Sequence, residues 1–587
     1  MSTRDWIVLV ITLLCIIAYG LYKSRTTKNL EGYFLSNRTL PWYLVLLSIM
    51  GTQASAVTFL SGPGQAYTDG MRFVQYYFGL PLAMIVLCIT FVPIFHKLKV
   101  FTAYEFLEKR FDLKTRSLTS FLFLLQRGLS TGISVAAPSI ILSALLGWDI
   151  FWTNVVMGGL LIIYTVSGGA KAVAYTQQLQ LIIIICSMAL AGYMVVHLLP
   201  EGVGFSDALR ISGEAGKLNV ITTGATEKGF DWTDKYNIIS GVIGGFFLAL
   251  SYFGTDQSQV GRYLTSKSLS ETRISLLMNG LVKIPMQFLI LLVGALVFTF
   301  YQFHPAPVFF NQSQIEKLNN SKYAAEGKQI VASFDSVNAS KKELTANWNS
   351  GADHSEINRL QKSADSLRRQ YKTLLEKPEV RAETNDTNYI FLRFVIDYLP
   401  KGLVGLLIAM IFLAAWGSIA AALNSLASST MIDFHKRHSK KEISQHQEYR
   451  ISQWYTLGWG IFCILIAQFA TVLGNSLIEA VNILGSLFYG VILGVFLLAF
   501  YFKKVRGNAV FWSAVIVEIY IVLSAIWPWL HTQMPGVMDS IPGGIDRFMQ
   551  SASKIGFLWL NAIGAAGVVV VGLIMQEFYR RERRDTV

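Results

Sequence analysis

The chain has 587 residues, of which 53% are hydrophobic and only 15% are charged. A soluble protein has about a quarter of its residues charged, so this composition excludes an ordinary soluble domain. Apolar runs of about 18 or more residues recur along the chain, and each is a candidate membrane-spanning helix. Because a bilayer core admits only helices or closed barrels, the sequence predicts an all-α polytopic membrane protein.

In chain order, the apolar runs predict thirteen membrane-spanning helices. They cover residues 5–22, 40–61, 73–96, 118–146, 150–167, 172–199, 238–256, 272–303, 402–432, 452–473, 477–501, 510–530 and 556–577. The first run lacks an A-x-A-like cleavage site, so we expect a retained helix rather than a signal peptide.

The net charge of +13 follows the predicted topology. Of the 50 Lys and Arg residues, 26 lie in alternate short loops and the C-terminal tail: 23–38, 97–116, 171, 262–273, 436–450, 503–506 and 580–584. This positive-inside bias predicts an external N-terminus, a cytoplasmic C-terminus and a location in the plasma (inner) membrane. It also argues against nucleic acid as a partner.

Residues 304–386 interrupt the membrane pattern because they are polar and rich in Asn, Ser and Lys. Apolar residues recur there at helical spacing in two series: Ile330, Phe334 and Val337, then Ile357, Leu360, Ala364, Leu367, Tyr371 and Leu374. The turn signal NSG (349–351) separates the two series. We expect an extracytoplasmic helical hairpin, which is either a solvated spacer or a lid over a binding site.

Helix-breaking residues occur in corresponding places of two halves, 40–199 and 238–502. The second span ends in SGPG (61–64), and the seventh opens with IGG (243–245) and ends with GTDQ (254–257). Interrupted helices at such corresponding positions indicate the binding site of a transporter. The halves therefore predict a five-plus-five arrangement whose first and sixth core helices are broken.

Helix 402–432, the eighth of this core, is unusually rich in Ala, Gly and Ser. Small side chains allow close helix packing, which explains Ala420–Ala422. Ser418 differs because it faces the stretch 48–56, where the first core helix is expected to unwind. Unwound carbonyls and a hydroxyl are suitable ligands for a hard monovalent cation. We expect an ion site between these two helices.

Four motifs, in order and at matching spacing, resemble the sodium:solute symporter family. They are YFLSNRTLPW (33–42), SGGAKAVAYT (167–176), FGTDQ (253–257) followed by RYL (262–264), and LNS (423–425) with Asp433 beyond it. The resemblance spans about residues 5–505 apart from the outer hairpin. It implies a LeuT-type inverted-repeat fold and sodium-coupled symport, with Na⁺ as the coupling ion.

The family's shared sodium site joins the first and eighth core helices. Carried over to this chain, it comprises the carbonyls of Gly51, Ala54 and Ala414 and the hydroxyl of Ser418. A second family hydroxyl falls on Gly417, which has no side chain, and Gln177 replaces the family's usual acidic residue. Both departures argue against a second sodium ion.

The resemblance also places a substrate cavity between the first, third, sixth and tenth core helices. Its candidate residues are Gln53, Thr58, Ala249, Tyr252, Lys283 and Asn482. Tyr252 matches an aromatic that closes the cavity from the cytoplasmic side, and Ala249 replaces an amide of sugar transporters. FGTDQ looks more like the branch that carries anions, monocarboxylates and vitamins. For Asn482, packing is the alternative.

Other polar residues in the spans have open roles. Lys283 and Arg127 are ionisable, so they are functional candidates, with snorkelling or structural pairing as the alternative. Asp256, Gln257 and Arg262 lie at the cytoplasmic end of the sixth core helix, where we expect a gate or a stabilising network.

These patterns divide the chain into six parts. They are an extra N-terminal helix (1–30), the first repeat (31–200), an outer loop with core helices six and seven (201–303), the hairpin (304–386), core helices eight to ten (387–505), and two extra helices with a basic tail (506–587).

The resulting hypothesis is sodium-coupled import of a small organic solute (a carboxylate or other anion, a vitamin-like molecule or a sugar) by alternating access. The partners expected are this solute and the lipid bilayer, with no obligate protein partner. The alternatives are proton-coupled or uncoupled transport by the same fold and a membrane sensor. The sensor has less support, because the sequence continues for only about ten residues after its last predicted span. No catalytic residues are expected: the eight histidines do not cluster in the spans.

Overall fold

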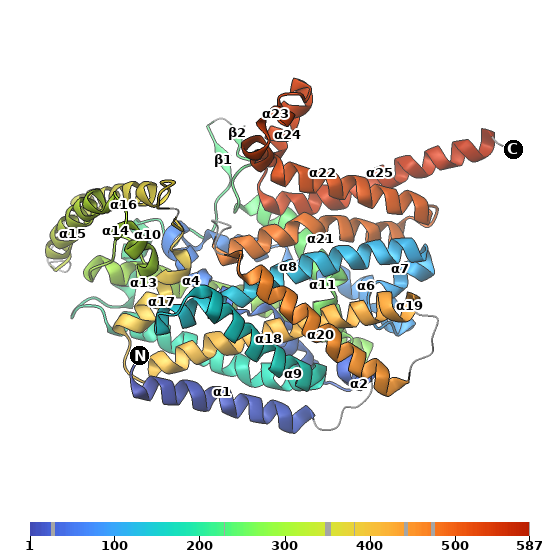
Figure 1. The fold of residues 1–587 in the computed structure, drawn as a ribbon, viewed down its shortest axis with the longest axis horizontal. Coiled ribbons are helices and arrows are strands. Elements are labelled where there is room, and N and C mark those ends of the chain that lie inside the picture. Colours follow the sequence, from blue (N-terminus) through green and yellow to red (C-terminus); the bar gives the residue numbers. More distant parts are fainter. Residues whose placement is uncertain are drawn as a thin grey trace.

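The computed structural model describes residues 1–24, 30–227, 229–346, 354–380, 382–438, 444–470 and 476–585. Within these ranges, nine helices are long and apolar enough to cross a membrane, or ten if the bent pair α3–α4 is one span. The predicted all-α polytopic fold is confirmed, whereas the number thirteen stays a prediction. In Figure 1 the N-terminus lies at one end of the helical bundle and the C-terminus at the other.

The first half of the chain forms the following elements: α1 (Thr3–Ser24), α2 (Leu30–Leu35), η1 (Ser36–Arg38), α3 (Trp42–Gln53), α4 (Ala56–Asp69), η2 (Met71–Tyr77), α5 (Leu80–Ile89), α6 (Phe91–Leu98), α7 (Glu105–Arg110), α8 (Leu113–Leu146), α9 (Ile150–His197), α10 (Phe205–Glu214), β1 (Ala225–Thr226) and β2 (Gly229–Phe230). The two strands pair antiparallel, with Ala225 opposite Phe230.

The remaining elements are η3 (Ser240–Gly244), α11 (Gly245–Thr255), α12 (Gln257–Tyr263), α13 (Leu269–Phe303), α14 (Gln312–Asn319), α15 (Ala324–Ala346), α16 (His354–Leu375), α17 (Thr387–Tyr398), α18 (Leu403–Ser429), η5 (Thr430–His435), α19 (Lys436–His438), α20 (Gln445–Ala467), α21 (Leu477–Tyr501), α22 (Gly507–Gln533), α23 (Pro535–Met538), α24 (Gly543–Ser553) and α25 (Phe557–Asp585).

Helix α9 contains both predicted spans 150–167 and 172–199 in one helical run. Its first part lies antiparallel to α20, because Asn154 donates to Ala467 O near the end of α20 and Val166 O accepts from Gln453 near its start. Its second part lies beside the middle of α3, where Gln177 bonds to Ser48. The two parts of α9 therefore pack against different helices.

The predicted helix end at 61–64 is wrong. Helix α4 continues through Pro63 to Asp69, and the glycines there serve packing instead. A Cβ on Gly64 would collide with Thr387 O of α17, and a Cβ on Gly294 of α13 would collide with Pro63. These small residues let three helices approach at backbone distance. The interruption lies earlier in the chain, at Ala54–Ser55, where α3 and α4 meet at a bend of 60°.

The sixth core helix is interrupted only at one of its two predicted places. At 243–245 the π-helical turn η3 passes into α11 without leaving helical geometry, so the predicted break there is wrong. Gly245 instead allows close packing, because a Cβ would meet Tyr76 O at 2.7 Å. The break lies at Asp256, whose extended backbone separates α11 from α12.

Helix α18 is the most enclosed of the apolar spans, with 89% of its apolar window buried. It contacts α1, α3, α4, α8, α9, α12 and α20. Its many Ala, Gly and Ser side chains permit this number of close neighbours, since bulky residues would hold the surrounding helices apart. The packing core of the bundle therefore lies around α18 and places Ser418 near the broken pair α3–α4.

The outer hairpin is helical, as predicted, and has its own small core. Helices α15 and α16 pack on each other and bury Phe334, Ala364, Tyr371 and Leu374. The predicted turn 349–351 lies outside the described residues. Figure 1 shows the pair projecting at the end of the bundle where the N-terminus lies.

A half-buried arginine joins the hairpin to the bundle. Arg368 of α16 donates to Tyr67 OH of α4 (3.3 Å) and to Pro307 O (2.9 Å), and its guanidinium lies 5.2–5.8 Å from the centres of the Tyr67, Phe310 and Phe334 rings. The hairpin therefore has its own core, a polar attachment to α4, and apolar contacts with the main core through Leu344 and Ile357.

We expect the hairpin to be dispensable for the transport step, because its apolar residues mainly contact one another. Replacing residues 323–377 with a short Gly/Ser linker should leave membrane insertion and sodium-dependent uptake within about twofold of wild type. Arg368→Ala in the intact hairpin is the matched control for loss of the attachment alone. Normal insertion with loss of uptake in the linker variant would instead favour the lid.

Candidate functional site

The interruption between α3 and α4 leaves two backbone carbonyls without their helical donors. Ser55 N–H donates to Gln53 O (2.9 Å) rather than to Gly51 O, and Thr58 N–H donates to Ser55 O (3.0 Å) rather than to Ala54 O. Carbonyls at a helix end need other partners. The two predicted carbonyl ligands on this helix are thus the ones that the break makes available.

Ser418 supplies a hydroxyl on the opposite side. It is 8% exposed and donates to Ala414 O (3.0 Å) and Ala415 O (3.1 Å) of its own helix. Because its proton points back to the backbone, its lone pairs are directed away from α18. Helix α18 packs against both α3 and α4. This geometry suits coordination of a cation by Ser418 together with the freed carbonyls.

Gln177 of α9 occupies the space between α3 and α18. Its Oε1 accepts from the Ser48 hydroxyl (2.7 Å), and its Nε2 donates to Gly417 O (3.0 Å) and Thr52 Oγ1 (3.2 Å). A Cβ on Gly417 would lie 2.5 Å from Gln180 Oε1, so the glycine makes room for a second glutamine. The neutral Gln177 amide therefore donates hydrogen bonds to two oxygens that could otherwise serve as ligands of a cation.

A cavity of about 150 Å³ adjoins the break. All six predicted substrate residues line it: Gln53, Thr58, Ala249, Tyr252, Lys283 and Asn482. Ser418 lines it as well, whereas Gly51, Ala54, Ala414 and Gly417 are not among its lining residues. The structure thus brings the predicted substrate residues together and places the serine of the predicted ion site at their edge.

Several cavity residues were not predicted from the sequence. Tyr76, Tyr77, Gln126 and Tyr489 line the cavity, and Tyr76 OH donates to Asn482 Oδ1 (3.1 Å). The pair Tyr76–Tyr77 offered a signal, since adjacent tyrosines occur where the third predicted span begins. Gln126 offered another, as a polar residue within an apolar run.

Arg127 of α8 lines the cavity and is paired with a buried carboxylate. Its guanidinium forms an ion pair with Asp256 and lies 5.4 Å from the centre of the Tyr252 ring. Tyr489 OH also donates to Asp256 Oδ2 (2.7 Å), and Tyr252 OH accepts from Gln259 (2.6 Å). The residue at the helix break, Asp256, is therefore part of a polar network next to the cavity. Such a network is expected for a gate.

The other two residues at this end have different environments. Gln257 bonds to Ala103 N (3.1 Å) and Phe101 O (2.7 Å), which ties α12 to the loop before α7. Arg262 is buried, with no hydrogen-bond partner at Nε or Nη1 among the described residues. Gln257 therefore has a stabilising contact, and neither residue lines the cavity.

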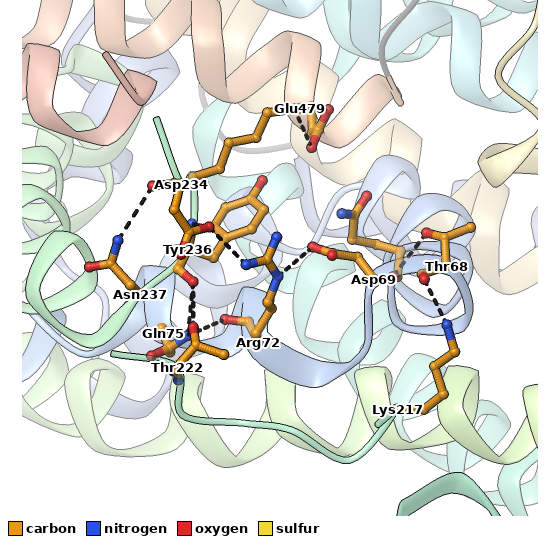
Figure 2. A network of polar contacts seen from close by, with 12 residues as sticks. Thr68, Asp69, Arg72, Gln75, Lys217, Thr222, Asp234, Tyr236, Asn237 and Glu479 are labelled. Atoms are coloured by element: carbon orange, nitrogen blue, oxygen red, sulfur yellow. Dashed lines mark hydrogen bonds and ion pairs between the residues drawn. The ribbon is translucent and has the colours of Figure 1, made fainter. Parts of the chain in front are cut away.

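A second network lies at the opposite end of the core helices. Figure 2 shows Arg72 between Asp69 (2.8 Å) and Asp234 (2.7 Å), which joins the end of α4 to the segment before η3. Lys235 pairs with Glu479 in the first turn of α21 (3.2 Å).

Further hydrogen bonds continue this second network. Gln75 bonds to Thr222 and Tyr236 O, and Lys217 donates to Thr68 O, as Figure 2 shows. The first, sixth and tenth core helices are thus linked on the side away from Asp256. These ion pairs could not be predicted from the sequence, because their partners are 162 and 244 residues apart in the chain.

Comparison with known proteins assigns the family. The model of the "Sodium:solute symporter family" matches residues 33–326 and 374–517. "Sodium/sialic acid symporter NanT" of Aliivibrio fischeri is 24% identical over 583 residues, covering 99% of this chain and 94% of that protein. "Sodium-dependent multivitamin transporter" of Oryctolagus cuniculus is 26% identical over 636 residues, covering 98% and 82%.

A solved structure shares the fold. It is described as "Substrate-bound outward-open state of a Na+-coupled sialic acid symporter reveals a novel Na+-site" and aligns with a TM-score of 0.71 at 23% identity over 98% of both chains. Fold and site define a multi-pass secondary transporter. The chain belongs to the sodium:solute symporter family. It is a transporter and not an enzyme, Na⁺ is its coupling ion, and a small solute is its substrate.

We expect Tyr252→Ala to abolish sodium-driven accumulation, because it removes the aromatic ring that lines the cavity next to the Arg127–Asp256 pair. Tyr252→Phe is the matched control: it loses only the hydroxyl bond to Gln259 and should keep at least a third of wild-type accumulation. The measurement is the ratio of internal to external labelled solute in proteoliposomes. Unchanged accumulation by Tyr252→Ala would exclude a barrier role.

Proposed function

We propose that this symporter imports a small organic solute across the plasma membrane, with the N-terminus outside and the C-terminus in the cytoplasm. The observation that carries the proposal is the cavity beside the α3–α4 break, which is lined by Ser418 and by all six predicted substrate residues. The opposite positions of the two termini along the bundle support the topology (Figure 1). The candidate solutes are those named for relatives, such as sialic acids, vitamins and monocarboxylates.

In this proposal, one sodium ion binds the carbonyls of Gly51, Ala54 and Ala414 and the hydroxyl of Ser418. The two carbonyls freed by the break support it, since desolvation of a cation in the membrane interior is compensated only by well-placed oxygens. Each inward charge contributes about 2.3 kcal/mol per 100 mV of membrane potential. At about 1.4 kcal/mol per tenfold, this drives roughly 40- to 50-fold accumulation of a neutral solute.

Proteoliposomes provide the test of this function. Labelled sialic acid, vitamins and monocarboxylates would be offered with an inward sodium gradient, with equal sodium on both sides, or with an inward proton gradient. The proposal expects concentrative uptake only with the sodium gradient. Uptake driven by protons alone would instead favour the alternative of a proton-coupled transporter.

Ser418→Ala should reduce sodium-dependent uptake at least tenfold while the protein still inserts in the membrane. Ser418 supplies the only side-chain oxygen of the proposed site, and alanine leaves the surrounding helix packing nearly unchanged. Ser425→Ala is the matched control, because Ser425 also donates to its own helix (Ala421 O, 2.8 Å) but does not line the cavity. Near-normal sodium activation of Ser418→Ala would exclude the assignment.

We expect a stoichiometry of one sodium per solute. The Gln177 amide donates to Gly417 O and Thr52 Oγ1, so these oxygens are already satisfied by protons. Sodium activation should therefore be hyperbolic, with a Hill coefficient near one, and reversal potentials should give a one-to-one ratio. A two-to-one ratio would contradict this expectation.

The complementary variant is Gln177→Asp with Gly417→Ser, which adds a carboxylate and a hydroxyl between α3 and α18. Because a Cβ at 417 would lie 2.5 Å from Gln180 Oε1, the Gln180 side chain must move to accommodate it. If these substitutions create a second site, sodium activation becomes sigmoidal. The single variant Gln177→Asp separates the contribution of the charge from that of the hydroxyl.

A further inference from the structure

A polar stripe runs along one face of α13. Asn279, Lys283 and Gln287 are four residues apart, so they lie on successive turns of the same face. All three are buried, at 0%, 1% and 0% exposure respectively. Among the described residues, Asn279 Nδ2, Lys283 Nζ and both polar atoms of Gln287 have no hydrogen-bond partner. Buried polar groups normally have partners, so four such atoms on one face indicate a missing ligand.

The stripe faces the broken first core helix. Asn279 Oδ1 accepts from Gln53 (2.8 Å), and a Cβ on Gly62 of α4 would lie 3.8 Å from Gln287 Nε2. Between them, Lys283 lines the cavity together with Gln53 and Thr58. Gln287 therefore lies between α13 and α4, and Lys283, one turn away, lies at the wall of the substrate cavity beside Tyr77.

The charges in the cavity are unequally compensated. Arg127 is neutralised by Asp256, with which it forms an ion pair. Lys283 has no such carboxylate among the described residues, and its Nζ lies 5.3 Å from the centre of the Tyr77 ring. An isolated ammonium in a membrane interior is costly, and ionisable residues there mark substrate or ion pathways. Among the described residues, the cavity therefore has one basic side chain without an acidic partner.

We propose that Lys283 and Gln287 bind the carboxylate of the transported solute. This inference rests on the proposed function and specifies the substrate class of that same cavity. One carboxylate oxygen pairs with Lys283 Nζ, and the other accepts a hydrogen bond from Gln287 Nε2. Residues four apart on a helix have Cβ atoms about 5–6 Å apart, so both side chains can reach one carboxylate. Asn279 Nδ2 offers a further donor on the preceding turn. A neutral sugar would leave the ammonium uncompensated.

The rest of the cavity suits an organic acid. Tyr76, Tyr77, Leu248 and Ile419 present aromatic and aliphatic surfaces next to the polar stripe. Such a combination of apolar wall and few placed polar groups is typical of sites for small organic ligands. The carboxylate would thus bind α13 while the body of the solute contacts these side chains.

The first experiment compares acids with their uncharged analogues. Sodium-driven uptake of lactate, pyruvate and sialic acid is measured in proteoliposomes, with competition by the carboxamide of each acid and by galactose. We expect uptake of at least one acid and at least a tenfold weaker competition by its amide. Equal competition by acid and amide would overturn the carboxylate assignment, and so would sodium-driven uptake of galactose without uptake of any acid.

The second experiment uses variants of the stripe. Gln287→Glu places a tethered carboxylate one turn from Lys283, which should occupy the ammonium and reduce acid uptake at least tenfold. Gln287→Leu, the matched control of similar size, loses only the amide donor and should raise KM two- to fivefold with kcat unchanged. Equal uptake by the two variants would contradict the proposal.

Loss of the charge itself gives an independent readout. Lys283→Gln should lose discrimination between acid and amide, so that their competition constants differ by less than threefold. Stabilisation of the purified protein by Na⁺ relative to K⁺ should persist in all three variants, which shows that they fold and retain the ion site. Unchanged discrimination by Lys283→Gln would overturn the assignment.

The two proposals fail differently. If Na⁺ neither stabilises the protein nor drives uptake, although acids exchange across the membrane in preference to amides, the sodium site is wrong and the carboxylate site stands. If Na⁺ drives uptake of galactose but of no acid, the sodium-coupled function stands and the carboxylate site is wrong.

Discussion

The interruption of the backbone hydrogen bonds at Ala54–Ser55 is the constraint on which the rest of the structure depends. In a bilayer, unpaired carbonyls are tolerated only where protein or a cavity surrounds them. Here α18 provides that enclosure, since its small side chains allow it to pack against both α3 and α4. The break in turn supplies what the surrounding helices lack, namely carbonyl oxygens directed into the centre of the bundle. The proposed ion binding and the helix packing thus depend on one local backbone geometry.

The buried charges near the cavity are also arranged around one residue, Asp256. Asp256 begins α12 and accepts from Ser258 N (2.8 Å), and the same carboxylate pairs with Arg127 and Tyr489. A single buried carboxylate therefore stabilises a helix start, a cation and a tyrosine near the cavity. Arg127 is already paired with Asp256, whereas Lys283 has no acidic partner among the described residues. This difference distinguishes the proposed binding face from the network around Asp256. Buried charges without a partner are the ones for which a ligand must be sought.

Much of this site could be predicted because it depends on local patterns and on a specific resemblance. Unwinding was expected over 48–56, but the structure is helical through Gln53 and breaks only at Ala54–Ser55. The break at Asp256 and the six substrate candidates in the cavity followed from helix-breaking residues and matched motifs. The error at 61–64 arose because Gly62, Pro63 and Gly64 are helix breakers by propensity, yet tertiary packing on α13 and α17 favours a continuous helix. Propensity is a weak signal where close packing decides. The ion pairs of Arg72 and Lys235 could not be predicted, since they join residues that only the fold brings together.

The two polar networks join the broken core helices to neighbouring segments on opposite sides of the cavity. One links Asp69 at the end of α4 to the segment before η3 through Arg72, and the other links Asp256 at the end of α11 to Arg127 of α8. The cavity lies between them, so a solute must pass one network to enter and the other to leave. Opening either costs ion pairs, whereas the bends at Ala54–Ser55 and Asp256 allow half-helices to move without disrupting their own hydrogen bonds. Broken helices thereby confine the conformational change to contacts that can be remade, which is what alternating access to a fixed site requires.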